Sequence, residues 1–381
     1  DQVYNKINQG SIWEYSAPKE LWTFGRNDDG QLGLNNKTQY SSPVQVPGTT
    51  WDKVPVGGET YTGAFIRTDG TLWICGKNEF GCLGLNQSQP SIGNISSPTQ
   101  IPGTSWSEIC LFNGRSGAIK TDGTLWTWGN GANNGELGLN EASPGTRYSS
   151  PVQVPGTTWS SISMSYVSSI STRTDGTLWS WGGNVYGGLG VPSIGTAKRS
   201  SPIQIPGSTW AYAEARHYSA IATKTDGTLW CWGDNNYGSL GINGGATDRR
   251  SSPTQIPGTT WAVGRKKFST NNGACSAIKT DGTLWSWGYN SYGSLGDNST
   301  VQRSSPVQCP GNTWTAVTVA NNSTFALKTD GTLWSWGRND SYGNLGHNDR
   351  VNRSSPVQIP GTDWTDQMYN AFQNLAIIKQ L

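Results

Sequence analysis

The side chains that most often carry catalysis are scarce in this chain of 381 residues. It has two histidines, His217 and His347, which stand in different parts of the sequence. No Ser/His/Asp order, Cys/His pair or H-E-x-x-H motif accompanies them. Glycine-rich stretches such as 129–135 do not match a phosphate-binding loop. The sequence therefore predicts that the chain is not an enzyme and that it uses no cofactor.

Metal binding has an equally weak basis in the sequence. The segment RNDDGQLG at 26–33 has Asp and Asn side chains but lacks the ligand spacing of a calcium loop. The cysteines form no C-x-x-C pair and recur at no fixed position, which favours six small buried or half-buried thiols and leaves a single disulfide open. They are Cys75, Cys82, Cys110, Cys231, Cys275 and Cys309. No metal site is predicted.

Binding chemistry is better represented than catalytic chemistry. Only 14% of the residues are charged, and the net charge is +2, so no general attraction to nucleic acid is expected. No run of 18 apolar residues exists, so no membrane span is expected. Against this background Arg265, Lys266 and Lys267 form a local group of cations, and Phe268 follows them as an apolar anchor. Arginine and aromatic residues are enriched at the energetic centres of protein interfaces.

An internal repeat supplies the elements that must position these residues. The Leu-Trp pairs follow one another at intervals of 49 to 55 residues, a period typical of a β-propeller. The sequence TDGTLWSWG occurs three times, and three close relatives bring the number of copies to six: 174–182, 280–288, 329–337, 68–76, 121–129 and 225–233.

Each repeat unit predicts four antiparallel strands. The first strand contains LWSWG and leads into a Gly-x-Leu-Gly turn, and the second reads SSPVQIP. The third strand opens on a tryptophan, and the fourth ends at Thr-Asp-Gly, whose Asp-Gly forms a tight hairpin. Tryptophans at fixed repeat positions predict packing between blades, with a stacking platform for sugars or bases as the alternative.

The two ends of the sequence complete each other. The chain begins with a first strand, KELW at 19–22, and ends with a fourth strand, AIIKQL at 376–381. We therefore expect strand 20–25 to pair antiparallel with strand 375–379 and so remove the open edges. The predicted fold is an all-β, seven-bladed β-propeller of four-stranded antiparallel blades at 19–381, preceded by a leader or linker at 1–18. Because the chain begins with Asp1 rather than methionine, we expect a processed form or part of something larger.

The Gly-x-Leu-Gly turn, the Asp-Gly hairpin, the LWSWG strand and the period near 50 together resemble the regulator of chromosome condensation repeat family over 21–379. The resemblance implies a seven-bladed propeller closed by both termini. It implies no single function, because members include a nucleotide-exchange factor for a small GTPase, chromatin binders, a secreted β-lactamase inhibitor, and bacterial and bacteriophage surface proteins. The uniform repeats look most like the bacterial and bacteriophage members. The histidine that the family often places before the fourth strand is kept only at His217.

The connections between strands fall into two classes. The fourth-to-first hairpin and the second-to-third turn are constant in length and share one face, which we call the hairpin face. The first-to-second and third-to-fourth connections vary and share the opposite face, the loop face. Because binding residues concentrate on variable loops, we predict a partner on the loop face, with neutral drift of exposed loops as the alternative.

The predicted partner-binding residues lie in the third-to-fourth connections. The longest of these segments, 264–274, includes Arg265, Lys266, Lys267 and Phe268. The other units contribute Tyr61, Phe112, Arg115, Tyr166, Arg216, His217, Tyr218 and Phe372. As an alternative, these aromatic side chains turn inward and fill the central channel, and the lysines are merely solvated.

Two functions remain open. The first is a non-enzymatic binding or structural module, extracellular or on a virion surface, that recognises a protein or a glycan. The alternative is an intracellular, cytoplasmic regulator of the nucleotide-exchange-factor type. The leader would join the propeller to a larger parent chain or assembly. Neither nucleic acid nor a membrane span is among the expected partners.

Overall fold

The computed structural model describes residues 17–57, 60–88, 91–131, 134–141, 145–245, 247–271, 273–320, 322–340, 342–370 and 374–380. Most of the expected leader and the predicted binding residue Phe372 lie outside the described residues. The described secondary structure is almost entirely β-strand, with three short 3-10 helices. None of these helices has the length and apolar character that crossing a membrane requires.

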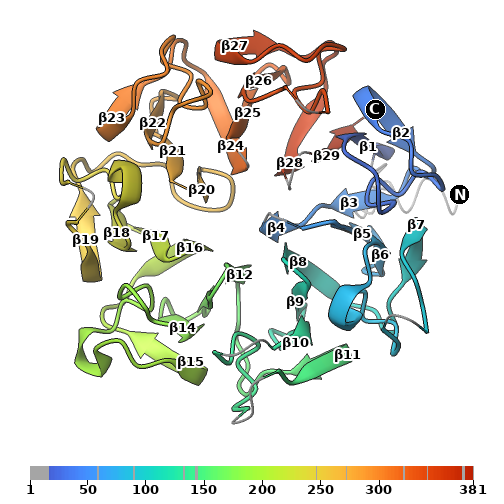
Figure 1. Cartoon of the computed structure of the whole chain (residues 1–381), viewed down its shortest axis with the longest axis horizontal. Helices are drawn as coiled ribbons and strands as arrows, with labels where there is room; N and C mark the ends of the chain where they lie inside the picture. The colour runs from blue at the N-terminus through green and yellow to red at the C-terminus, as the bar shows by residue number, and fades with distance from the viewer. Residues whose placement is uncertain are drawn as a thin grey trace, which may run out of the picture.

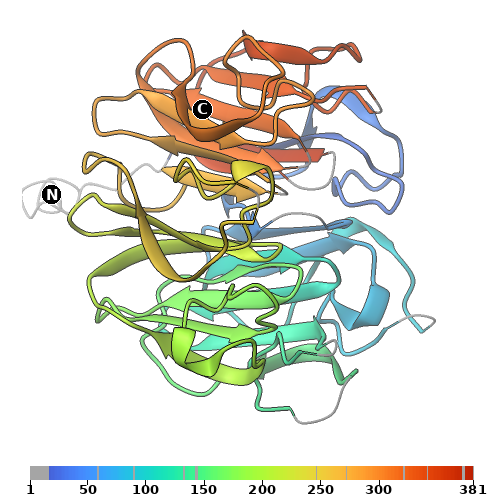
Figure 2. The same ribbon diagram turned by 60° about the vertical axis from the view of Figure 1, so that its left-hand side comes forward.

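Seven sheets surround a central axis, which confirms the all-β, seven-bladed propeller (Figure 1). In each blade the strand that follows the second-to-third turn lies toward the axis, and in blade 2 the short strand at 56–57 pairs on its inner side. The strand that ends at the Asp-Gly hairpin, the LW strand and the SSP strand follow outward in that order. Figure 2 shows the strands of each blade running between the two faces of the ring.

The first three blades follow the predicted strand order. Blade 1 contains β3 (Trp51–Lys53), β5 (Thr62–Arg67), β6 (Leu72–Gly76) and β7 (Ile95–Gln100). Blade 2 contains β8 (Trp106–Phe112), β9 (Arg115–Lys120), β10 (Leu125–Asn130) and β11 (Arg147–Gln153). Blade 3 contains β12 (Ser163–Met164), β13 (Ser168–Thr172), β14 (Leu178–Gly182) and β15 (Arg199–Ile205).

The next three blades repeat this order. Blade 4 contains β16 (Trp210–Arg216), β17 (Ser219–Lys224), β18 (Leu229–Gly233) and β19 (Arg250–Ile256). Blade 5 contains β20 (Phe268–Asn271), β21 (Ala274–Ile278), β22 (Leu284–Gly288) and β23 (Arg303–Gln308). Blade 6 contains β24 (Trp314–Ala320), β25 (Ser323–Lys328), β26 (Leu333–Gly337) and β27 (Arg353–Gln358). The 3-10 helices are η1 (Glu79–Gly81), η2 (Pro192–Ile194) and η3 (Asn236–Gly238).

Blade 7 combines the two ends of the chain and confirms the predicted closure. It contains β28 (Trp364–Asn370), β29 (Asn374–Gln380), β1 (Lys19–Gly25) and β2 (Tyr40–Val46). β1 pairs antiparallel with β29 over their whole length, from Lys19 opposite Gln380 to Gly25 opposite Asn374. The ring therefore has no unpaired strand edge at the point where its termini meet.

The hairpin face is built from a repeated hydrogen-bond relay. In blade 1 the Asp69 carboxylate accepts hydrogen bonds from the Thr71 backbone N–H at 3.0 Å and from the Thr71 hydroxyl at 2.6 Å. The Thr71 hydroxyl in turn accepts the indole N–H of Trp73 at 2.9 Å. The same relay recurs at Trp126, Trp179, Trp230, Trp285 and Trp334. The repeated sequence TDGTLW is thus explained by the hydrogen bonds among its Asp, second Thr and Trp side chains, which stabilise one turn.

The Gly-x-Leu-Gly turn is the contact between neighbouring blades. The indole N–H of Trp128 in blade 2 donates to the Cys82 carbonyl in the blade 1 turn at 2.8 Å. A Cβ at Gly84, whose φ is +67°, would lie only 2.8 Å from that indole nitrogen, so glycine is required. Equivalent indole bonds form at Trp181, Trp232, Trp287 and Trp336. This confirms the predicted packing of tryptophans between blades.

The two units without a second tryptophan keep the packing by other means. Cys75 takes the place of this tryptophan in blade 1, and its thiol donates to the Gln31 carbonyl at 3.6 Å. Phe24 takes it in blade 7, where its ring lies against Gly346 of the preceding blade. All six cysteines are buried and free, as the sequence predicted. Burial raises the pKa of the Cys75 thiol to about 12, so this thiol stays protonated.

Candidate functional site: the loop face and the axial channel

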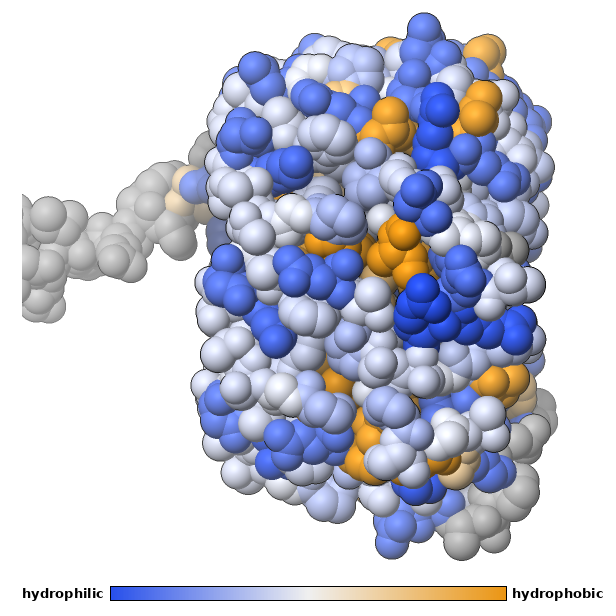
Figure 3. Space-filling view, turned by 90° about the vertical axis from the view of Figure 1, so that its left-hand side faces the viewer, coloured by the Kyte–Doolittle hydropathy of each residue, from blue (hydrophilic) through white to orange (hydrophobic). Residues whose placement is uncertain are grey.

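Exposed apolar side chains gather on the loop face. Among the described residues seven large hydrophobic side chains are exposed, and five of them lie in first-to-second or third-to-fourth connections: Tyr166, Val185, Tyr237, Val301 and Val351. They are 48% to 60% exposed. In Figure 3, which views the ring from its side, several apolar patches lie toward the right between polar residues. A partner could cover this surface without disturbing the core.

Three of the predicted residues meet in one aromatic cluster on this face. The Tyr166 and His217 rings are stacked, with centroids 6.0 Å apart and an interplanar angle of 13°. Tyr218 meets Tyr166 edge-on at 6.2 Å and Tyr186 at 5.0 Å. The guanidinium of Arg249 lies over the Tyr186 ring at 4.0 Å. We call these five residues the aromatic cluster, and it joins the connections of blades 3 and 4.

Two predicted arginines are buried beneath the loop face rather than facing solvent, and one of them supports this cluster. Arg115 is only 4% exposed; it donates to the Tyr166 carbonyl at 2.8 Å and lies 3.5 Å from the Glu136 carboxylate. Burial lowers the Arg115 pKa, and Glu136 opposes this shift. Arg216 is 3% exposed and donates to the Thr270 carbonyl at 2.7 Å. Placing these two side chains on an exposed binding surface was wrong, because both extend sideways to brace neighbouring blades.

Phe112 and Tyr61 have different fates. Phe112 is completely buried in the core between blades 2 and 3, so its placement on the binding surface was also wrong. Tyr61 is half-buried on the loop face, with the Arg26 guanidinium 4.8 Å and the Lys77 ammonium 5.5 Å from its ring centroid. It therefore resembles the aromatic cluster in chemistry but lies on another part of the ring.

The sequence also contained a signal that was missed. The residue directly before Gly-x-Leu-Gly is aromatic in five of the seven units, and in the structure these rings lie on the loop face. A cation lies over several of these rings: the Arg147 guanidinium is 4.4 Å from the Phe80 ring centroid, and the Arg338 guanidinium is 4.8 Å from that of Tyr292. The five residues are Phe80, Tyr186, Tyr237, Tyr292 and Tyr342.

The segment with three cations lies at the opposite end of the blade from where it was predicted. The Ile278 carbonyl accepts the Ala262 N–H, and the Ile278 N–H donates to the Lys267 carbonyl, so the residues between them bulge out as an extra loop. This axial loop, 263–267, therefore follows Trp261 directly and lies near the Asp-Gly hairpin. The turn from β20 to β21 on the loop face has an ordinary length.

The side chains of this segment also point elsewhere. Phe268 is completely buried in the core between blades 4 and 5, and Lys266 is only 4% exposed. The Lys267 ammonium donates to the Thr315 carbonyl of blade 6 at 2.6 Å. Arg265 reaches across the ring and donates to the Val54 carbonyl of blade 1 at 2.6 Å. The predicted exposed patch at 265–268 is therefore wrong, because this insertion turns toward the ring axis and its side chains are buried or bonded to other blades.

Blade 1 also contributes to the channel. After β3 the chain leaves its own blade, and β4 (Val56–Gly57) pairs in parallel with Cys110 and Leu111 of β8. Val54 and Val56 are both completely buried. The two longest intervals between the third-strand tryptophan and the fourth-strand cation therefore supply chain to the axis rather than to the loop face.

Other titratable groups have structural explanations. The His347 Nε2 lies 2.9 Å from the Ser335 hydroxyl, and burial lowers the His347 pKa to about 4, with Arg353 adding to the shift. This imidazole is therefore neutral near pH 7 and carries no obvious acid–base chemistry. Within the described ranges, no group of three or more His, Cys, Asp or Glu side chains is placed to hold a metal ion.

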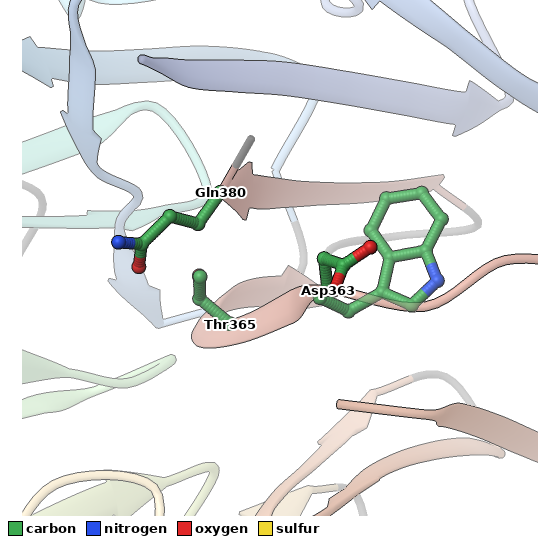
Figure 4. Close-up of a pocket in the computed structure, with 4 residues that line it drawn as sticks. Asp363, Thr365 and Gln380 are labelled. Atoms are coloured by element: carbon green, nitrogen blue, oxygen red, sulfur yellow. The ribbon is translucent and has the colours of Figure 1, made fainter. Parts of the chain in front are cut away.

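An open hollow of about 610 Å³ lies on the hairpin face where β28 begins and β29 ends. Asp363, Trp364, Thr365 and Gln380 line it, and Figure 4 shows Thr365 and Gln380 extending toward the same space. The Gln380 N–H donates to the Asp363 carbonyl at 3.0 Å and fixes its edge. These groups form no convergent set of charges, so this hollow is a weaker candidate than the loop face.

Comparison with known proteins supports the same architecture. The family model described as "Regulator of chromosome condensation (RCC1) repeat" matches residues 20–59, 69–110, 226–264, 281–327 and 330–366, which together cover more than half of the chain. Among solved structures, human WBSCR16 covers 95% of this chain at 16% identity with a TM-score of 0.81, and 99% of that chain is matched. Yeast Prp20p covers 99% of this chain at 18% identity, again with a TM-score of 0.81, and 95% of that chain is matched.

Curated relatives are more similar in sequence but longer. The ultraviolet-B receptor UVR8 of Arabidopsis thaliana is 25% identical over 302 residues, which cover 75% of this chain and 64% of the receptor. The human E3 ubiquitin-protein ligase HERC2 is 26% identical over 311 residues, which cover 78% of this chain and 6% of the ligase. The chain thus spans less than two thirds of either relative. By its repeats and its fold, the chain belongs to the regulator of chromosome condensation (RCC1) repeat family.

Proposed function

We propose that this propeller is a binding module that recognises a partner protein through its loop face and acts by binding rather than by catalysis. The observation that carries the proposal is the aromatic cluster together with the exposed apolar side chains on that face. Aromatic and arginine side chains provide much of the binding energy at protein interfaces. The constant hairpin face offers no comparable concentration of exposed apolar residues among those described.

The support beneath the cluster favours this proposal. Arg115 holds the Tyr166 carbonyl, and the Ser165 hydroxyl donates to the His217 carbonyl at 3.2 Å. The rings are thus fixed on a braced backbone, which lowers the entropy lost when a partner binds. The exposed fraction of Tyr166, 48%, leaves one face of the stack open to such a partner.

The comparisons favour a regulator over a surface or virion protein. The structure of yeast Prp20p was described with its binding to Gsp1p and histones, and another structure shows Kap60 bound to yeast RCC1. The relatives described above come from a plant, human and yeast, so the similarity to bacterial and bacteriophage members stays a prediction. We therefore favour an intracellular regulator of the exchange-factor type over a virion or glycan-binding role.

Binding assays on the full chain test this proposal. We would measure binding to purified small GTPases, nucleotide-free and loaded, and to histone dimers by biolayer interferometry. The double variant Tyr166→Ala/Tyr218→Ala should weaken binding of the recognised partner by at least about 30-fold, the loss typical of a hot spot. Tyr292→Ala is the matched control, because Tyr292 also lies under an arginine but outside the aromatic cluster.

Three outcomes would contradict the proposal. Binding that is unchanged in the double variant, or hydrogen-exchange protection confined to the hairpin face, would show that the loop face is not the binding surface. Loss of binding in the Tyr292→Ala control to the same extent would show that the aromatic cluster has no special role.

A further inference from the structure

The axial loop contains the most unusual lysine among the described residues. Lys266 is 4% exposed, and its φ of +62° is a left-handed conformation that non-glycine residues rarely adopt. Its carbonyl accepts the Val317 N–H of blade 6 at 2.8 Å, which fixes the loop against that blade. Burial, and to a smaller extent the charge of Arg265, lower the Lys266 pKa to about 7. Strained backbone and shifted pKa values both concentrate at functional sites.

Charged groups from several elements face this lysine. Arg265 lies on the same loop, Glu214 and Arg216 come from β16, and Asp366 comes from β28. Glu108 of β8 faces both Lys266 and Arg265, and Lys53 of β3 faces Glu108 as well. We call Lys53, Glu108, Tyr212, Glu214, Arg265 and Lys266 the axial cluster. Figure 1 shows that β3, β8 and β16 border the centre of the ring.

The charges of the axial cluster are close without being directly paired. None of the ion pairs within 4 Å between described residues involves Glu108, Glu214, Arg265 or Lys266. Burial raises the pKa of both glutamates, because it disfavours the charged carboxylate. The cluster therefore contains more positive charge and more donors than its own carboxylates balance.

Several buried donors also lack a partner. The Tyr212 hydroxyl and the Arg265 Nε have no hydrogen-bond partner among the described residues. Tyr212 is 4% exposed, so bulk water does not readily satisfy it. The Glu108 Oε1 is likewise buried without a hydrogen-bond partner among the described residues. A ligand with several acceptor oxygens would satisfy these donors together.

We propose that the axial channel binds a small oxyanion, of the phosphate, sulfate or carboxylate class, between Lys266, Arg265 and Tyr212. The Lys266 ammonium and the Arg265 guanidinium supply positive charge, and the Tyr212 hydroxyl donates a directional hydrogen bond to one oxygen of the ligand. The ligand links blade 5 to blade 4, beside the hydrogen bond that Arg265 already forms with blade 1. This inference goes beyond the proposed function on the loop face and does not depend on it.

The proposal predicts a pH dependence with a definite sign. Binding requires protonated Lys266, whose pKa is about 7 in the free protein. The contribution of Lys266 to the affinity should therefore be nearly constant below pH 6 and should fall roughly tenfold per pH unit well above pH 7. Protonation of Glu108 or Glu214 at lower pH acts in the same direction, because it removes negative charge from the site.

Isothermal titration calorimetry of the full chain with sodium sulfate is the direct test, since sulfate stays dianionic over this pH range. Phosphate and acetate titrations at the same ionic strength distinguish inorganic tetrahedral anions from carboxylates. We expect saturable binding at pH 6 that is absent in a sodium chloride titration. Lys266→Met should abolish it, and Tyr212→Phe should weaken it by about three- to tenfold through loss of one hydrogen bond.

Lys267→Met is the matched control, because the Lys267 ammonium is already bonded to the Thr315 carbonyl. It should leave sulfate binding unchanged. Absence of saturable binding at pH 6, or binding that survives in Lys266→Met, would overturn the proposal. An equal loss in Lys267→Met would also overturn it, since it would indicate screening of general positive charge. If Lys266→Met does not fold, full retention of sulfate affinity in Tyr212→Phe is the contrary result.

Discussion

The hairpin face and the loop face are built by the same seven blades, yet one is nearly constant and the other varies from blade to blade. On the hairpin face the repeated Asp, Thr and Leu-Trp side chains are bonded to one another: the aspartate accepts from threonine, and threonine accepts from tryptophan. On the loop face the connections meet only locally, as Tyr166 and His217 do. The difference shows that the repeated TDGTLW residues hold one bonded turn, whereas the varying connections form exposed surface in some blades and, after Trp51 and Trp261, supply chain to the axis.

Cations reinforce the constant face. The Arg173 guanidinium lies between Trp159 and Trp179, 4.2 Å and 4.4 Å from their ring centroids. Lysine or arginine occupies the same place between two tryptophans in five other blades: Arg67, Lys120, Lys224, Lys279 and Lys328. The charge at the end of each fourth strand therefore belongs to the packing of its blade.

The largest loss of stability should come from a tryptophan that packs between two blades. Trp181 is completely buried, and its indole donates to the Glu136 carbonyl of the preceding blade at 2.9 Å. Trp181→Ala should lower the free energy of unfolding by about 3–5 kcal/mol, because it leaves a cavity and an unbonded carbonyl. Urea unfolding measures this change. A loss below about 1 kcal/mol would contradict the account of contacts between blades.

Acid should weaken the loop face of blade 6 before the hairpin face. The His347 pKa is lowered in the fold to about 4, so this group stabilises the protein above the unfolded pKa near 6.5 and loses that effect as the pH falls toward 4. The hairpin aspartates also have lowered pKa values, mainly through hydrogen bonds from threonine, so their contribution is lost only below about pH 4.

The melting temperature of wild type and of His347→Asn between pH 7 and 4 separates these effects. The wild type should lose about 1–2 kcal/mol over this range through His347 after allowance for solvent screening, and the variant should lose less. Parallel pH curves for the two proteins would show that His347 does not control this loss.

A smaller effect is expected from breaking one relay on the hairpin face. In Thr177→Val the side chain keeps its shape but loses the hydroxyl that joins Asp175 and Trp179. The free energy of unfolding should fall by about 1 kcal/mol. Thermal unfolding monitored by tryptophan fluorescence measures it, with Thr259→Val in a second-to-third turn as the comparison. If both variants unfold at the wild-type temperature, the relay does not explain the constant wording.

The smallest effect should come from the exposed surface. Tyr237 is 48% exposed and meets Tyr289 edge-on at 4.9 Å. Tyr237→Ala should change the free energy of unfolding by less than about 0.5 kcal/mol, as is usual for surface substitutions. Urea unfolding again provides the measurement. A loss comparable to that of Trp181→Ala would remove the distinction between a bonded face and a free one.

The sequence predicted those parts of the fold that depend on repetition. The first-strand motif at Lys19 and the fourth-strand motif before Gln380 were enough to predict the pairing of the termini, because hairpin order fixes which strands are neighbours. The burial of the repeated tryptophans also followed from their fixed positions. Because the pattern recurs six or seven times, one assignment of strands and turns must fit every copy, and few assignments do.

The candidate site was harder to predict because it depends on departures from the repeat. Counting residues from Trp261 to Lys279 revealed an insertion but could not say where it leaves the strand, and Ile278 bonds on both sides of it. Whether Arg115 and Phe112 are buried or exposed depends on side-chain direction at the end of an inner strand, where burial and exposure alternate within one or two residues. The partner-binding role of Tyr166, His217 and Tyr218 stays a proposal.

The pairing of β1 with β29 has a consequence for how the chain could be rearranged. At this one boundary the ring does without the Thr-Asp-Gly turn that joins the same two strands in the other blades. The covalent link there is therefore dispensable for the architecture. A circular permutant that joins Gln380 to Lys19 through Thr-Asp-Gly and opens at any other such turn should give the same propeller, so the starting point of the chain is interchangeable among seven positions.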